Sequence, residues 1–505
     1  MFSRTNAIDR LASEIAKFNL EPEQNALPQQ QNIENARTSL ISHLPVTGLG
    51  HEEAIEHIRK EIAPGFNGSS RSSTYYGFVT GGITLAGRLA DNLVTAYDQN
   101  VQVHLPEETI ATEVEDRALS LLCELLDFNP EDWGHRTFTT GATASNVLGL
   151  ACAREHVIVE AASARGRPDI SVGDLGIVAA MKCAEIDEIQ VLTTVPHSSL
   201  SKAASLVGLG RASVKLVGLE GAPHRFDFAK LAKLIGMPRV ATIVAVSASE
   251  VNTGLFATNG RDEMETLRKL CDIHGAWIHI DGAFGIMARL LNTAPYTSMY
   301  RNCEGLELAD SITGDCHKLL NVPYDCGFFI SRHRNLASSV FQNPNAAYLS
   351  AGGINDILSP LNIGIENSRR FRALPVYATL TAYGREGYRD MVERQVELAR
   401  AIAEFVLENE EFELLPIFEK TKEEVLSNIF IIVLFRAKDE RLNKELVQRI
   451  KDSRKVYVSG TAWDGKPACR FAVSNWIADK EKDMPMIKTV LQKVLDDWKS
   501  TNKGV

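Results

Sequence analysis

The stretch that decides the fold is GDCHKLLNVPYDCG, residues 314–327. It places Lys318 directly after His317, in the turn between a polar segment (residues 310–313) and an apolar strand (residues 327–330). A lysine amine beside an imidazole, in a pocket floored by a sheet, can form a Schiff base with a carbonyl compound. The alternative is an ordinary surface lysine, and residues elsewhere in the chain decide between the two.

Composition and charge narrow the class of protein. At 505 residues the chain exceeds the roughly 250–300 residues at which single cores stop growing, so it contains at least two domains. A net charge of -10 disfavours nucleic acid or an anionic membrane as partner. No stretch approaches the ~18 apolar residues of a membrane span. The 8 cysteines lack Cys-x-x-Cys spacing, which predicts reduced thiols in a cytoplasmic protein and no metal site.

The pattern of the chain changes twice, which predicts three segments. Residues 1–70 alternate helical patterns with polar breaks and end in a stretch rich in Pro, Gly and Ser. Residues 71–375 alternate short apolar runs with helical patterns and form the large domain. Residues 376–505 have the pattern of a smaller α+β domain.

The large domain is predicted to be α/β with a mostly parallel sheet. Its β-branched apolar runs predict strands at residues 189–195, 214–219, 240–246, 277–280 and 328–330. Because these runs are apolar on both faces and alternate with helices, we expect helices to cover both sides of the sheet. Ligands of such sheets bind beyond the carboxyl ends of the strands, so functional side chains should directly follow these runs.

An aspartate follows the run at residues 277–280. Asp281 is flanked by the small residues Gly282 and Ala283, so its carboxylate can approach a flat ring and bond an edge nitrogen. The alternative is a helix N-cap.

Polar residues also follow two other runs. His197 comes just after residues 189–195, where an imidazole can lie on an aromatic ring, although a loop histidine satisfied by its neighbours is the alternative. Glu250 follows residues 240–246 and adds a polar group at the same edge of the sheet.

A further site is predicted at a helix start. Residues 139–146 read Thr-Thr-Gly-Ala-Thr-Ala-Ser-Asn and open an Ala-rich helix over residues 147–162. Small residues at a helix start expose backbone N–H groups that favour an anion, phosphate above all. The alternative is a plain Ser/Thr N-cap.

The helix start, the histidine, the strand-end aspartate and the His-Lys pair, in this order, resemble the group II pyridoxal-phosphate-dependent amino-acid decarboxylases. The segments YGFVTGG (residues 76–82), DCHKLLNVPYDCG (315–327) and SRRFRAL (368–374) also look like that family. The resemblance runs from about residue 75 to residue 476. It implies fold type I, a mostly parallel sheet sandwiched by helices, and the cofactor pyridoxal 5′-phosphate.

The resemblance also implies roles for individual residues. Lys318 would hold the cofactor as an internal aldimine until a substrate amine displaces it. Asp281 would keep the pyridine nitrogen protonated, while His197 and Ala283 would pack on the two faces of the ring. The substrate would be a small molecule, an L-amino acid that loses its carboxylate as CO₂ and leaves as the amine. The phosphate would be held by Gly141, Ala142 and Thr143, with His317 nearby.

Two more positions come from the same resemblance. Arg369 is expected to pair with the substrate carboxylate, since a guanidinium fork suits a carboxylate; an interdomain ion pair is the alternative. Tyr348 resembles the loop tyrosine that protonates Cα in aromatic members, with a packing role as the alternative. In the family this loop usually serves the neighbouring subunit, which implies a homodimer.

Departures from the family pattern keep other functions open. Members often carry Gly-Thr-Thr where this chain has Ser249-Glu250-Val251, which leaves the substrate class undecided. A carbon–carbon lyase, an aldehyde synthase or another secondary-metabolic enzyme could use the same cofactor and fold, and a non-catalytic relative could lack turnover altogether. The joint presence of Lys318, Asp281 and His197 favours an enzyme, a carboxy-lyase.

Overall fold

The computed structural model describes residues 25–343, 357–417 and 420–502. The chain forms two compact units. The first contains residues up to Gly82 together with Glu397–Ile417 and Val433–Val505, and the second contains Ile83–Val396 and Phe418–Ile432. This grouping differs from the three segments expected from sequence, because residues 75–76 add a strand to the C-terminal sheet.

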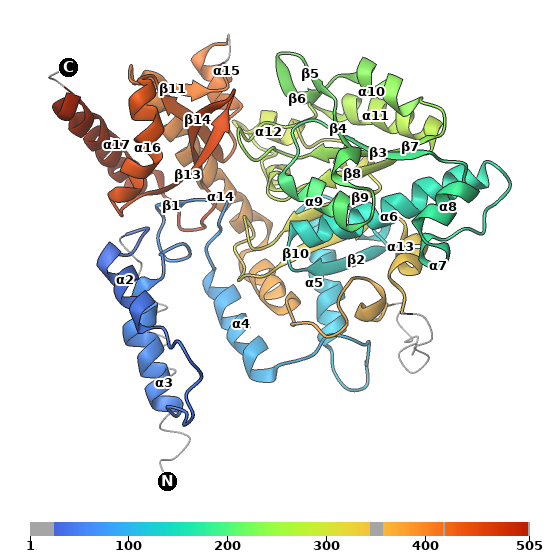
Figure 1. The fold of residues 1–505 in the computed structure, drawn as a ribbon, viewed down its shortest axis with the longest axis horizontal. Coiled ribbons are helices and arrows are strands. Elements are labelled where there is room, and N and C mark those ends of the chain that lie inside the picture. The colour runs from blue at the N-terminus through green and yellow to red at the C-terminus, as the bar shows by residue number, and fades with distance from the viewer. Residues whose placement is uncertain (1–24, 344–356, 418–419, 503–505) are drawn as a thin grey trace. The chain divides into compact units, whose positions relative to one another are not determined.

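The second unit is built on a sheet of seven strands in the described residues (Figure 1). Neighbouring strands β9, β8, β7, β3 and β4 pair in parallel, whereas β10 is antiparallel to both β9 and β2. In spatial order the strands are β2 (His135–Thr139), β10 (Gly327–Ser331), β9 (Ser311–Asp315), β8 (Trp277–Asp281), β7 (Val240–Ser247), β3 (Glu188–Thr193) and β4 (Val214–Leu216).

Helices cover both faces of this sheet, as predicted. Helix α6 (Ala142–Ser163) runs along β7 to β10, while α10 (Phe228–Ile235) and α11 (Arg261–His274) contact β7 and β8 on the other side (Figure 1). The core between α6 and the strands is formed by fully buried side chains such as Leu150 and Val191. The unit also contains α4 (Leu85–Tyr97), α5 (Ala111–Leu125), α7 (Val172–Leu175), α8 (Ile177–Cys183), α9 (Ser198–Leu206), α12 (Thr297–Arg301), α13 (Arg334–Phe341), α15 (Lys422–Ser427), the hairpin β5 (Gly218–Leu219) and β6 (Ala222–Phe226), and most of α14 (Ala373–Glu408).

The main difference from the sequence prediction concerns β9. Residues 310–313 are polar and were expected to lead into a turn, yet Ser311–Asp315 is a buried central strand. Its hydroxyl groups are satisfied inside the protein: Ser311 Oγ accepts from Trp277 Nε1 at 2.9 Å, and Thr313 Oγ1 contacts the Phe328 carbonyl at 3.4 Å. A polar strand is therefore stable here because its hydrogen bonds are formed internally.

The first unit holds the other sheet. Its strands in the described residues are β1 (Tyr75–Tyr76), β13 (Tyr457–Trp463), β14 (Lys466–Ala472), β12 (Ile432–Ala437) and β11 (Phe412–Leu415), in this order. The ring of Tyr75 stacks on that of Tyr457, with centroids 4.5 Å apart. The helices are α2 (Gln30–Ser39), α3 (His51–His57), α16 (Glu440–Asp452) and α17 (Lys480–Asn502).

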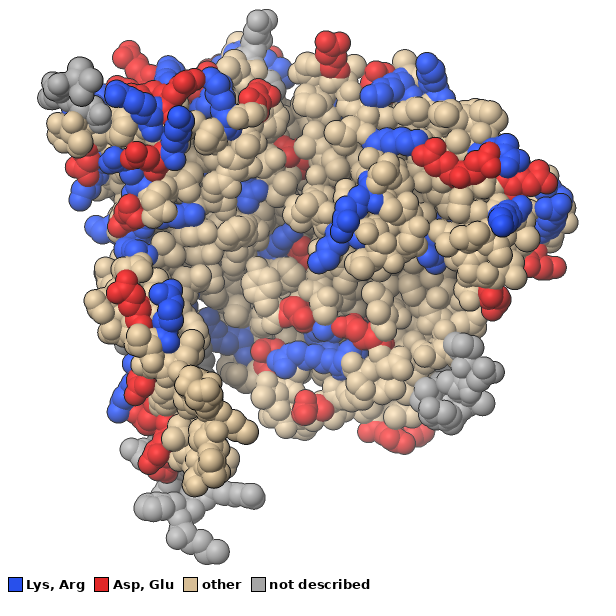
Figure 2. Space-filling view, in the orientation of Figure 1, with Lys and Arg blue, Asp and Glu red and all other residues tan. Residues whose placement is uncertain are grey.

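The surface and the helices bear on possible partners. Acidic and basic side chains are interspersed over the face shown in Figure 2, without the continuous basic stripe that follows a phosphate backbone. Among the described residues, every helix is too short or too polar to traverse a lipid bilayer.

Candidate active site

The predicted functional residues gather at one edge of the seven-stranded sheet. Asp281 is the last residue of β8, and the parallel register pairs it with Thr313 of β9, two residues before Asp315. The segment after β3 carries His197, and the turn after β2 begins helix α6. These strands point the same way, so their carboxyl ends bring the side chains together.

Lys318 lies in the turn after β9, one short turn beyond Asp315. Its Nζ is 2.8 Å from Asp315 Oδ2, and it lies 5.8 Å from the centre of the Phe284 ring. The lysine side chain is 19% exposed, whereas that of Asp315 is 4% exposed. The amine is therefore accessible to a small molecule while its charge is held by a buried carboxylate.

His317 is fixed by three contacts. Its Nδ1 accepts the backbone N–H of Cys326 at 3.1 Å, Nε2 is 3.5 Å from Asp315 Oδ1, and its ring packs against that of Tyr324 with centroids 4.3 Å apart. Burial lowers the pKa of His317, although the Asp315 charge opposes this shift. The His317 imidazole is thus uncharged at neutral pH and lines the site.

The Asp281 carboxylate can accept further hydrogen bonds besides those it already receives from the protein. Its Oδ2 accepts from Asn146 Nδ2 at 3.0 Å, and Oδ1 accepts the N–H of Ala283 at 3.3 Å. A carboxylate has about four acceptor positions, so two remain for a ligand. The backbone of Gly282 packs tightly, because an added Cβ would come within 2.9 Å of the Thr313 carbonyl.

The start of α6 has the features of an anion site. The Ala142 N–H donates to Asp315 Oδ1 at 2.6 Å, whereas the N–H groups of Thr143 and Ala144 have no acceptor among the described residues. Gly141 has φ +153°, and a Cβ there would lie 3.2 Å from the His317 ring. Glycine thus lets His317 approach the helix start, and the donors fit a phosphate group.

His197 caps helix α9. Its Nδ1 accepts the Ser199 N–H at 3.2 Å and lies 2.8 Å from Ser199 Oγ, while the ring is exposed. The buried Glu250 carboxylate closes its own turn by accepting the N–H of Asn252 at 2.8 Å. An exposed ring with a fixed orientation is suited to stacking.

Arg369 is engaged by the protein itself. Its guanidinium pairs with Glu115, and Nε donates to the Val101 carbonyl at 3.1 Å and Nη1 to the Phe138 carbonyl at 3.4 Å. Burial raises the pKa of Glu115 against the opposing charge of Arg369. These contacts support the ion-pair alternative, within one unit rather than between domains. Tyr348 lies outside the described residues.

Sequence reasoning missed two polar residues of the site. Asp315 stood inside the quoted lysine segment without a role, although a carboxylate three residues before a lysine can pair with it across one turn. Asn146 stood inside the helix-start motif, but its partners Asp281 and His279 are far away in sequence. No local pattern could have revealed that contact.

Comparison with known proteins agrees with this geometry. The family model described as "Pyridoxal-dependent decarboxylase conserved domain" matches residues 35–430. L-2,4-Diaminobutyrate decarboxylase of Acinetobacter baumannii is 29% identical over 325 residues, which cover 63% of this chain and 58% of that protein. Phenylacetaldehyde synthase of Arabidopsis thaliana is 24% identical over 444 residues, 85% of this chain and 84% of that protein.

The fold has solved counterparts. Catharanthus roseus tryptophan decarboxylase, crystallised with L-tryptophan, superposes with a TM-score of 0.75 at 20% identity, covering 98% of this chain and 97% of that chain. The predicted fold type I architecture is confirmed, and so is the family resemblance. The chain therefore belongs to the pyridoxal-dependent decarboxylase family and is a pyridoxal-phosphate-dependent lyase of the amino-acid decarboxylase class.

Proposed function

We propose that this chain removes the α-carboxyl group of an L-amino acid as CO₂, with Lys318 as the residue that binds the cofactor covalently. The observation that carries the proposal is the accessible Lys318 amine, 2.8 Å from Asp315 at the carboxyl end of β9. Asp281 ends the neighbouring strand, so a carboxylate that can accept a ring N–H lies at the same sheet edge.

Each residue has a definite task in this proposal. When bound, pyridoxal phosphate supplies the electron sink for the breaking bond. Lys318 would bind its aldehyde, Asp281 would accept a hydrogen bond from its ring nitrogen, and His197 and Ala283 would pack on the two faces of the ring. The free N–H groups of Thr143 and Ala144, next to Gly141 and Ala142, bind the phosphate, with His317 beside them.

Asp315 fixes the position of the Lys318 side chain in this proposal. Its buried carboxylate lies 2.8 Å from Nζ and holds the Lys318 amine in a fixed position at the site. Its bond to the Ala142 N–H couples the lysine turn to the phosphate-binding helix start. The site is thus organised before any ligand arrives, which lowers the cost of binding.

The active form is a homodimer in this proposal. Helix α4 exposes an apolar stripe at four-residue spacing, formed by Leu85, Leu89, Leu93 and Tyr97, which are 51% to 73% exposed. Apolar surface of this kind is typical of an interface between subunits. Sedimentation should give twice the chain mass, and Leu89→Glu with Leu93→Glu should give the monomer.

A cytoplasmic location completes the proposal. All 8 cysteines are free thiols, and all but Cys183 are buried. Unpaired thiols in this number are typical of a reducing compartment.

Two measurements test the function. Borohydride treatment of the cofactor-loaded protein, followed by peptide mass mapping, should place the reduced cofactor on Lys318; a label on another residue refutes the assignment. A screen of the twenty amino acids and 2,4-diaminobutyrate for CO₂ release should then identify the substrate, with aromatic and acidic amino acids tested first. Release of amine supports a decarboxylase, whereas aldehyde, ammonia and peroxide would identify an aldehyde synthase.

A further inference from the structure

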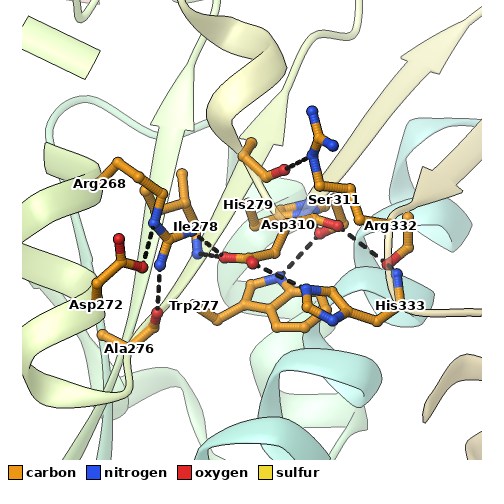
Figure 3. Close-up of polar contacts among 12 residues, drawn as sticks. Arg268, Asp272, Ala276, Trp277, Ile278, His279, Asp310, Ser311, Arg332 and His333 are labelled. Atoms are coloured by element: carbon orange, nitrogen blue, oxygen red, sulfur yellow. Dashed lines mark hydrogen bonds and ion pairs between the residues drawn. The ribbon is translucent and has the colours of Figure 1, made fainter. Parts of the chain in front are cut away.

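A continuous chain of buried hydrogen bonds lies behind the Asp281 carboxylate. Trp277 Nε1 donates to Ser311 Oγ at 2.9 Å, and Ser311 Oγ is 2.8 Å from His279 Nδ1 (Figure 3). His279 Nε2 is 2.8 Å from Asn146 Oδ1, and Asn146 Nδ2 donates to Asp281 Oδ2 at 3.0 Å. Trp277, Ser311, His279 and Asn146 are all fully buried.

The direction of each hydrogen bond in this chain is fixed by chemistry. The indole of Trp277 can only donate, so Ser311 Oγ accepts from it and keeps its own proton for His279 Nδ1, its other contact; the Asp281 end, below, requires this direction. The His279 proton then lies on Nε2 and is donated to Asn146 Oδ1. Burial lowers the pKa of His279 to about 4, so the ring is neutral and holds this single tautomer.

The Asp281 end of this series of hydrogen bonds fixes the direction. An ionised Asp281 can only accept, so the amide nitrogen of Asn146 faces it and the amide oxygen faces His279. The second N–H of Asn146 donates to Ser199 Oγ at 3.2 Å. Both directions therefore meet at Asn146 without conflict.

The branch through Ser199 determines the protonation of His197. Ser199 Oγ accepts from Asn146 and donates its proton to His197 Nδ1 at 2.8 Å, and the Ser199 N–H also points to Nδ1. An Nδ1 atom that accepts hydrogen bonds cannot carry a proton. The His197 ring is then neutral with its proton on Nε2.

The packing around this chain leaves little freedom. Gly149, in the middle of α6, lies against the His279 ring, and a Cβ there would be 2.3 Å from His279 Cε1. Glycine inside a helix costs about 1 kcal/mol relative to alanine. That cost is offset here by the close approach that lets His279 reach Asn146.

We propose that Asn146 is a positioning residue for the reaction: one amide orients the Asp281 carboxylate and, through Ser199, sets the tautomer of His197. This inference rests on the proposed roles of Asp281 and His197 toward the cofactor. Asn146 acts through these two side chains. Its effect is that one buried amide contacts the Asp281 carboxylate directly and the His197 ring through Ser199, so the orientation of both side chains depends on the same residue.

The experiment compares Asn146→Asp and Asn146→Ala with a matched control. Asn146→Asp keeps the shape but replaces the donor with a charge, and Asn146→Ala removes the amide. The control is Gln190→Ala on β3, which deletes another fully buried amide, one that is hydrogen-bonded to the Leu234 carbonyl and to Thr242 of β7. Gly149→Ala should displace the His279 ring while residue 146 remains asparagine. It is the test variant to use if the Asn146 variants fail to fold.

Three quantities are measured on the full chain. The first is the ¹⁵N spectrum of histidine-labelled protein without cofactor, with the His197 signal assigned by its loss in His197→Gln. The second is the midpoint of the pH titration of the bound cofactor's absorbance. The third is the cofactor Kd by equilibrium dialysis.

Wild-type protein should show His197 protonated on Nε2, and Asn146→Asp should change that tautomer. Both Asn146 variants and Gly149→Ala should shift the absorbance midpoint and weaken cofactor binding by about 10- to 100-fold, the range for outer partners of a bound group. Gln190→Ala should lower Tm but leave the midpoint and Kd unchanged. The inference is overturned if wild-type His197 carries its proton on Nδ1, or if the Asn146 variants behave like Gln190→Ala. Failure of the proposed function would appear differently, as wild-type protein with no cofactor on Lys318.

Discussion

Strand β9 has an aspartate at each end. Asp310 lies where the parallel strands begin, which we call the Asp310 edge, and Asp315 lies where they end, which we call the Asp315 edge. Asp310 precedes the strand, and Asp315 is its last residue. Both are buried, and both pair with a cation from their own unit. Of the described residues, those at the Asp315 edge include a partly exposed amine and backbone N–H groups that a ligand could use.

The Asp310 edge is closed by its own hydrogen bonds (Figure 3). Asp310 Oδ2 accepts from Arg268 Nη1 at 2.8 Å and from the Ile278 N–H at 2.7 Å, and Oδ1 lies 2.9 Å from His333 Nε2. Arg268 Nε also lies 2.7 Å from Asp272. Burial alone would raise the pKa of Asp310, but the His333 and Arg268 contacts outweigh it and lower the pKa.

The Asp315 edge retains unused bonding capacity. Thr143 and Ala144 keep free N–H groups in the described part of the chain, Lys318 is partly exposed, and Asp281 has acceptor positions to spare. A cavity of about 530 Å³ borders the Asp310 edge, so a hollow with charged walls is not enough to make a ligand site. A binding site requires polar groups that the fold leaves unsatisfied.

The largest effect is expected at the Asp315 edge, from Lys318→Ala. Loss of the amine should remove covalent cofactor attachment and lower kcat by at least ~10⁴-fold, since no other group supplies the nucleophile. Stopped assays of CO₂ release and the absorbance of the bound cofactor measure both effects. Lys202→Ala, on helix α9, is the matched control and should keep wild-type turnover. Unchanged turnover in Lys318→Ala would contradict the mechanism.

Arg369→Met tests a residue that sequence assigned to the substrate and the structure pairs with Glu115. Removal of one partner of a buried ion pair should lower the free energy of unfolding by about 3–5 kcal/mol. Urea unfolding measures this change, and the double variant with Glu115→Gln should recover most of it. A raised KM with unaltered stability would instead support the substrate role.

Asp281→Asn weakens a hydrogen-bond acceptor at the Asp315 edge. Without the carboxylate charge, the cofactor ring nitrogen loses a charge-assisted hydrogen bond, and kcat should fall by about 10²-fold together with cofactor affinity. Steady-state kinetics and equilibrium dialysis measure these effects. Normal kinetics would refute the role of Asp281.

Asp310→Asn is the matching substitution at the Asp310 edge. Arg268 and His333 lose their anionic partner, so the free energy of unfolding should fall by about 2 kcal/mol, while kcat and KM stay within a factor of about two. Denaturant unfolding and steady-state assays of the same preparation separate the two. A large loss of turnover at full stability would show that the Asp310 edge takes part in function.

The smallest effect, taken over one pH unit, is a pH dependence of stability that comes from two buried histidines. Burial lowers the pKa of His279 and of His135 to about 4, below the unfolded value of 6.5. From pH 6.5 down to 4 the unfolded chain therefore binds more protons, and stability falls by about 1.4 kcal/mol per pH unit for each histidine. His279→Gln should reduce this slope. An equal slope in the variant would mean that His279 is protonated in the folded protein.

The comparison also shows how far sequence reasoning reached. Apolar periodicity located β3, β7, β8 and β10, because both faces of a central strand are buried. It missed β9, whose polar residues are stable only because Trp277, His279 and the β10 backbone satisfy them. The same limit applied to Arg369, whose partner Glu115 is distant in sequence.

The sequence alone determined which chemistry the chain can carry. It placed Asp281 and His197 after apolar strands and Lys318 in the turn before another, since local periodicity and small neighbouring residues are encoded over a few positions. Tertiary structure alone decided which polar groups remain free: Asp315 holds the lysine, Asn146 links Asp281 to His197, and Arg369 is consumed by an ion pair. The reason is that a hydrogen-bonding group is available to a ligand only after the fold has brought up, or failed to bring up, its partners from distant parts of the chain.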